Sequence, residues 1–266
     1  MENGGKNITE IKLYECGYCV NNLGHVFKGH KKEIRNFPAL VALIKHKEFG
    51  NILYDTGYSE LIYQNGFVSF LYNAINKSYV KPQDSIYSKL LAEGKAPEKI
   101  DKIILSHAHP DHIGGLRLFN NYQLISTKEV IDTLKGGNAF KLVFRNMRPK
   151  GDVEYVAVKE YMGDSFLRKY FHKLYDVLGD GSIIGVELNG HAKGQLGIYF
   201  PEQQMFFVAD ACWGNDLLAK VETMRFIPRR IQNNYKEYLN TAKALRALSL
   251  EHPEISIIYS HDKMEE

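Results

Sequence analysis

Three histidines and one aspartate occur within six positions in the middle of the chain, directly after the apolar residues 103–105. Successive side chains of an extended segment alternate between its two faces, so His107 and His109 are expected to point the same way. Asp111 and His112 follow on a turn and can face a second point of the same cavity. Imidazole and carboxylate are ligands suited to zinc, iron or manganese. The fold must therefore deliver the end of a strand into a cavity that suits two adjacent cations.

The pattern His107-x-His109-x-Asp111-His112 after an apolar strand resembles the signature of the metallo-β-lactamase superfamily. The other motifs of that superfamily can be matched in the expected order along the chain. They are Asp55-Thr56-Gly57 after a strand, Gly190-His191 before Gly194 and a strand, Asp210 at the end of residues 205–209, and His261 after residues 255–259.

The resemblance implies a role for each matched residue. His107, His109 and His191 would bind a first metal ion, Asp111, His112 and His261 a second, and Asp210 would bridge the two ions. The cofactor would be two divalent metal ions, with zinc expected and iron or manganese as alternatives, because these metals share the same ligands. A hydroxide between the ions would be the nucleophile, Asp111 would pass a proton to the leaving group, and Asp55 would orient a ligand histidine.

Length and composition agree with a single domain over residues 1–266. A chain of 266 residues with 44% hydrophobic residues can build a sizeable core. The resemblance implies an α/β fold, the four-layer αββα sandwich, with helical inserts around residues 58–94 and 128–180. The net charge of +3 does not indicate a nucleic-acid partner, and no apolar run is long enough to cross a membrane. Because residues 1–10 are also polar, a cytoplasmic location is expected.

Hydrophobic periodicity predicts the secondary structure. Strands are expected over residues 11–16, 40–45, 51–55, 102–105, 122–125, 182–188, 196–200, 205–209 and 255–259. Helices are expected over residues 58–77, 84–93, 166–178 and 235–245, the second of them capped by Asp84.

The expected substrate is a small molecule with a lactone, ester or thioester bond. Residues 90–101 resemble the segment before the metal motif in acyl-homoserine lactonases, and in that branch an insert near residues 58–79 forms an acyl pocket or a homodimer contact. We therefore expect Phe67, Phe70 and Trp213 to line the pocket. Trp213 is a departure, because those lactonases often carry a tyrosine at that place and an indole cannot supply a phenol.

Two other activities use similar ligands. A phosphodiesterase or nuclease would hold phosphate with Arg225, Arg229 and Arg230, although a solvated surface is the simpler interpretation of that cluster. A mononuclear iron sulfur dioxygenase shares much of the histidine pattern. Cys16 and Cys19 have the spacing of half a zinc knuckle, but without a second pair nearby we expect them to be structural.

Overall fold

The computed structural model describes residues 7–263, and its first part forms a seven-stranded sheet. The first three strands of the sheet pair antiparallel, and β3, β5, β6 and β7 run parallel. The order across the sheet is β4-β1-β2-β3-β5-β6-β7. The strands are β1 (Ile8–Asn22), β2 (Ile34–His46), β3 (Gly50–Tyr54), β4 (Lys77–Tyr79), β5 (Ile100–Ile104), β6 (Tyr122–Ser126) and β7 (Val153–Ala157).

The later part of the chain forms a six-stranded sheet in the order β13-β12-β11-β10-β9-β8. Neighbouring strands are antiparallel except β12 and β13, which are parallel. The strands are β8 (Lys159–Glu160), β9 (Leu174–Asp176), β10 (Ile184–Glu187), β11 (Leu196–Phe200), β12 (Met205–Phe207) and β13 (Ser256–Ile258).

Alternation along the strands separates the core into two parts. In β2, Ala42 and Ile44 belong to the cluster that joins the two sheets, whereas Val41 and Leu43 belong to the cluster that includes the helices. Tyr54 crosses between the sheets, since its ring lies 5.9 Å from that of Phe207 and its hydroxyl donates to the Leu196 carbonyl. Successive residues of β2 therefore point to opposite faces of the sheet, and both faces are buried. This is expected for a sheet that is covered on both sides.

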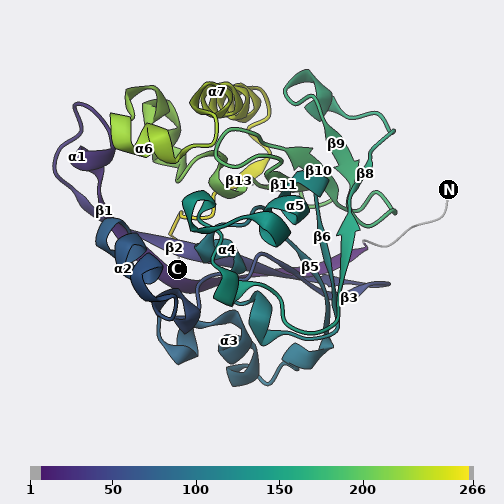
Figure 1. Cartoon of the computed structure of the whole chain (residues 1–266). Coiled ribbons are helices and arrows are strands. Elements are labelled where there is room, and N and C mark those ends of the chain that lie inside the picture. Colours follow the sequence, from purple (N-terminus) through teal and green to yellow (C-terminus); the bar gives the residue numbers. More distant parts are fainter. Residues whose placement is uncertain (1–6, 264–266) are drawn as a thin grey trace.

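Helices cover the outer faces, so the expected four-layer αββα sandwich is confirmed. Helix α3 lies below the seven-stranded sheet and α7 lies above the six-stranded one (Figure 1). The helices are α1 (Leu23–Val26), α2 (Gly66–Ile75), α3 (Ile86–Ala92), α4 (Pro110–Ile113), α5 (Lys128–Gly136), α6 (Phe226–Ile231) and α7 (Tyr235–Glu251). Within residues 7–263, no helix has the length and apolar character needed to span a membrane.

The first insert is close to its expected form. The predicted helix over 58–77 is split into a 3-10 turn at Glu60–Tyr63 and α2, which begins at Gly66 with a positive φ of 56°. Helix α3 is capped by Ser85, whose hydroxyl accepts from Ser88 N–H, and not by Asp84.

The predicted helix over 166–178 is wrong. The segment contains a 3-10 turn at Phe166–Lys169 and then β9, which pairs with both β8 and β10. Leu167, Phe171 and Leu174 are buried at helix-like spacing, but sheet pairing determines the backbone here. The second insert, 128–180, is therefore helical only at α5 and otherwise carries strands and 3-10 turns.

Candidate metal centre

All seven predicted ligands meet at one edge of the two sheets. The segment after β5 and helix α4 supply residues from the first sheet, and the loops after β10, β12 and β13 supply residues from the second. In each of two groups, one ligand atom per residue lies within 4.8 Å of the others. The first group is His107, His109 and His191, and the second is Asp111, His112, Asp210 and His261.

Close backbone packing holds α4 in place. Pro110 begins the helix, where the missing N–H is no loss, and the His112 carbonyl accepts from both the N–H and the hydroxyl of Thr56. A Cβ on Gly114 would lie 2.5 Å from the Gly57 carbonyl oxygen. The turn after β3 and the helix that carries Asp111 and His112 can pack this closely only because glycine stands at position 114.

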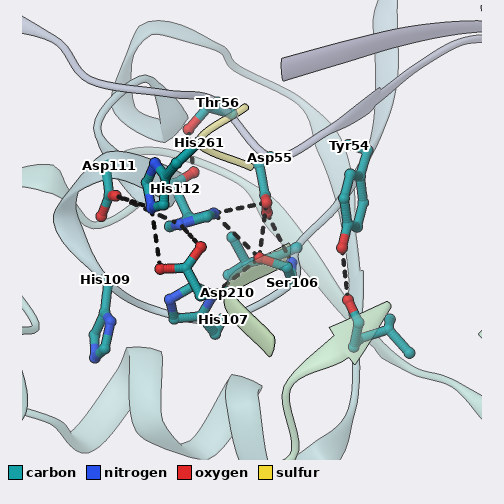
Figure 2. Close-up of polar contacts among 12 residues, drawn as sticks. Tyr54, Asp55, Thr56, Ser106, His107, His109, Asp111, His112, Asp210 and His261 are labelled. Carbon is teal, nitrogen blue, oxygen red and sulfur yellow. Dashed lines mark hydrogen bonds and ion pairs between the residues drawn. The ribbon is translucent and has the colours of Figure 1, made fainter. Parts of the chain in front are cut away.

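A buried hydrogen-bond network sets the tautomers of His107 and His112 (Figure 2). Asp55 accepts from the N–H and the hydroxyl of Ser106, each at 2.7 Å, and its Oδ2 lies 2.8 Å from His112 Nδ1. A carboxylate only accepts, so His112 Nδ1 carries the proton. The Ser106 hydroxyl proton is already used on Asp55, so Ser106 Oγ accepts from His107 Nδ1, 3.0 Å away. In the neutral form of each ring, Nε2 then carries the lone pair.

Two other ligand histidines are oriented in the same manner. His191 Nδ1 lies 2.8 Å from Gln232 Oε1, and His261 Nδ1 lies 2.8 Å from the Pro38 carbonyl oxygen. Acceptors at these positions place the proton on Nδ1 and direct the Nε2 lone pairs into the cluster. Sequence patterns missed Gln232 and Pro38, which are far from the ligands in sequence, while Ser106 could have been found because it immediately precedes His107.

Three buried side-chain atoms of these residues lack a hydrogen bond, and a bound metal ion would give them a partner. His107 Nε2, His112 Nε2 and Asp210 Oδ1 are buried and make no hydrogen bond, although His112 Nε2 lies 3.2 Å from Asp210 Oδ1. Buried polar atoms without partners are costly, and these three belong to the proposed ligand residues. Nitrogen and carboxylate oxygen are the donors that zinc, iron and manganese accept.

Burial and charge set the protonation of the cluster. Burial lowers the pKa of His107, His109 and His191, with the neighbouring imidazoles adding to the effect at His107 and His109. The neutral form that binds a metal is therefore favoured at these three. Burial would also lower the pKa of His261, but the charges of Asp210 and Asp111 outweigh it and raise that pKa to about 9. The second group thus has an excess of negative charge that attracts a proton or a cation.

A cavity of about 270 Å³ opens over the cluster. Phe67 and Phe70 are not part of this lining, and the prediction that they form the pocket is wrong. They lie on the solvent side of α2 with exposed fractions of 71% and 67%. The wall consists of Phe37, Leu142, Pro110, Val26, Ile75, Trp213, Ile227, Pro228 and Ile231 together with Cys19, Asn21, Asn22, His25, Tyr58, Tyr72 and Asn76.

The cysteines take no part in the ligand clusters. Cys16, Cys19 and Cys212 are buried free thiols, and burial raises the pKa of each one, to about 12 for Cys19 and Cys212. Protonated thiols of this kind behave as small apolar groups. Cys19 differs from Cys16 in lining the cavity.

The two-sheet fold and the His/Asp clusters together define a metal-dependent hydrolase. Residues 34–251 match the family model of the metallo-beta-lactamase superfamily, and the chain belongs to that superfamily.

Solved structures share this fold at low sequence identity. An N-acyl homoserine lactone hydrolase with the product N-hexanoyl-L-homoserine at its catalytic metal centre has a TM-score of 0.73 and 19% identity, over 96% of this chain and 94% of that chain. A mutant of AiiA from B. thuringiensis, with N-decanoyl-L-homoserine bound, has a TM-score of 0.71 and 19% identity, over 96% and 94%. AidC, a dizinc quorum-quenching lactonase, has a TM-score of 0.59 and 17% identity, over 96% and 88%.

Replacing Gln232 by leucine is expected to weaken metal binding at the first group about 10- to 100-fold, because His191 Nδ1 loses the acceptor that sets its tautomer. Competition with a chromophoric chelator measures this affinity. Gln203→Leu is the matched control, since Gln203 donates to the Ile8 carbonyl, away from the ligands. Equal affinities in both variants would show that Gln232 does not orient His191.

Proposed function

We propose that this protein is a dinuclear metal-dependent hydrolase of small acyl substrates, with a lactone or thioester bond ahead of a phosphodiester. The observation that carries the proposal is the position of Asp210 between the two ligand groups. Its Oδ2 lies 3.3 Å from His191 Nε2 of the first group and 3.2 Å from His261 Nε2 of the second. One carboxylate in contact with both groups is what a bridged pair of cations requires.

The ligand roles follow the two groups. His107, His109 and His191 would hold one ion, Asp111, His112 and His261 the other, and Asp210 both. Two bound divalent ions, zinc foremost, would lower the pKa of a shared water to about 7 and polarise the substrate oxygen.

We assign the handling of the leaving group to Asp111. It lines the cavity, and its Oδ2 lies 3.6 Å from both His112 Nε2 and His261 Nε2. A carboxylate at the boundary between the ligands and the cavity could take up the proton that the attacking water loses and pass it to the leaving oxygen or sulfur as the acyl bond breaks.

The cavity wall supports an acyl substrate. Phe37, Leu142 and Ile231 offer apolar surface beside the ligands, which suits an acyl chain. Three of the solved structures with this fold hold an N-acyl homoserine, and we extend that class of substrate, acyl compounds with a hydrolysable ring or ester, to this chain.

The arginine cluster gives less support to a phosphodiester substrate. Arg225 donates to the Gly24 carbonyl and Arg229 to the Met224 carbonyl, so both guanidinium groups are engaged by the backbone. Arg230 lies over the ring of Phe226, 5.9 Å from its centroid. None of the three arginines is among the residues that line the cavity over the ligands.

The test compares hydrolysis of a matched lactone, thioester and phosphodiester by protein loaded with zinc, manganese or iron. We expect the acyl bonds to be cleaved fastest, and His109→Ala to remove that activity because the first group loses a ligand. A dominant phosphodiester rate would replace the acyl assignment. No hydrolysis by folded, metal-loaded protein would refute the hydrolase.

A further inference from the structure

Two buried phenols share a hydrogen bond in the wall of the cavity. Tyr58 follows the Asp55-Thr56-Gly57 turn, Tyr72 lies on α2, and both line the same cavity as Asp111. Their hydroxyl oxygens are 2.8 Å apart. Neither phenol is required to build the ligand groups, so the pair is free to act on whatever occupies the cavity.

Counting protons shows that one donor of the pair is unused. Two phenols carry two O–H groups, and the hydrogen bond between them uses one. The described part of the chain offers no further oxygen or nitrogen acceptor to either hydroxyl. The Cys19 thiol lies beside Tyr58, but sulfur is a weak acceptor. Burial raises the pKa of both phenols well above 10, with the Asp111 charge adding to it, so both protons stay in place.

The two residues of the pair differ in burial. Tyr58 has an exposed fraction of 1%, whereas Tyr72 has 8%. The Tyr72 ring also packs edge-on against Phe144, with centroids 5.5 Å apart, which fixes its direction. Because both residues line the cavity and Tyr72 is the less buried of the two, we take Tyr72 as the end of the pair that a ligand reaches.

We propose that Tyr72 binds the substrate by donating a hydrogen bond to an oxygen of the bound acyl compound, while Tyr58 donates to the Tyr72 oxygen and orients it. This assignment rests on the proposed hydrolase function. It makes Tyr58 a positioning residue, because it acts only through Tyr72. It also supplies a phenol to the cavity from α2, although Trp213 occupies the place where lactonases often carry a tyrosine. Donation from Tyr58 strengthens the Tyr72 donor, since hydrogen bonds in a chain polarise one another.

Steady-state kinetics of single and double variants test the proposal on whichever of the lactone and thioester substrates the wild type cleaves faster. Tyr72→Phe is expected to raise KM about fivefold while kcat changes less than about twofold, because a neutral hydrogen bond made equally in the ground and transition states is lost. Tyr58→Phe is expected to raise KM about twofold. The double variant should match Tyr72→Phe alone, because Tyr58 has no effect once the Tyr72 hydroxyl is absent.

The control is Tyr122→Phe, a buried phenol that donates to the Leu116 carbonyl and does not line the cavity. Metal content and the midpoint of urea unfolding verify that each variant is folded and loaded. An unchanged KM for Tyr72→Phe would refute its assignment and leave the hydrolase intact. Independent, multiplying effects of the two variants would refute the positioning role of Tyr58. If the wild type cleaves none of the substrates, the proposed function fails and this assignment fails with it.

Discussion

Asp210→Ala is expected to reduce the metal content to one ion or fewer per chain and to lower kcat about 100-fold or more, since loss of a several-kcal/mol charge stabilisation corresponds to at least this factor. The reason is the position of the carboxylate. It contacts His191 of the first ligand group and both His112 and His261 of the second. Removing it takes a ligand from both groups and leaves the buried imidazoles without their counter-charge.

Metal analysis after gel filtration and initial rates with the best substrate measure the two effects together. Asp262→Ala is the control, because Asp262 is a nearby carboxylate that accepts from Asn215 N–H and belongs to neither ligand group. Full activity of Asp210→Ala with only one ion bound would show that hydrolysis does not need the bridged pair.

Asp55→Ala is expected to lower the free energy of unfolding by about 3 kcal/mol, because it breaks a buried network of charged hydrogen bonds. The Ser106 N–H and hydroxyl and His112 Nδ1 all lose their acceptor. Asp55 also has a positive φ of 61°, a conformation that alanine adopts less readily than aspartate or asparagine. Urea unfolding of the metal-free protein measures the change.

Asp55→Asn separates the stability role from the metal role. Asparagine accepts from Ser106 N–H and tolerates the same backbone conformation, so most of the stability should remain. The amide N–H₂ of asparagine cannot accept a hydrogen bond from His112 Nδ1. The His112 tautomer that carries its proton on Nδ1 and leaves Nε2 free is then no longer stabilised. We expect second-group metal affinity to fall about 10- to 100-fold in this variant. Wild-type affinity would mean that another group sets the His112 tautomer.

The residues of the two groups could be brought together from sequence because each one follows a predicted strand or lies in the His-x-His-x-Asp-His motif. His191, Asp210 and His261 each stand beside an apolar run that predicts a strand, and strand ends gather at one edge of a sheet. The acceptors that orient them could not be found in this way. Pro38 uses a backbone carbonyl, which no residue pattern reveals, and Gln232 reaches His191 only through tertiary packing.

The cavity wall was the part least accessible from sequence. Helix α2 carries large apolar residues around much of its circumference, so periodicity does not say which face is inward. The structure exposes Phe67 and Phe70 and turns Tyr72 inward. The helix prediction for 166–178 was wrong for a related reason. Burial of residues three to four apart is typical of a helix, but a turn followed by a strand produces the same spacing here.

The parallel pairing of β12 with β13 gives the site an order of assembly. His261 follows β13, and this segment is joined to the first sheet by the hydrogen bond from Leu40 N–H to the Ser260 carbonyl. The ribosome releases residues 107–191, which contain the whole first ligand group, before it releases residue 261. The second group can close only when β13 has docked against a partner strand made some fifty residues earlier. We therefore expect the nascent chain to trap its first cation before it can trap its second, so that metal supply during synthesis influences how much of the protein reaches the native state.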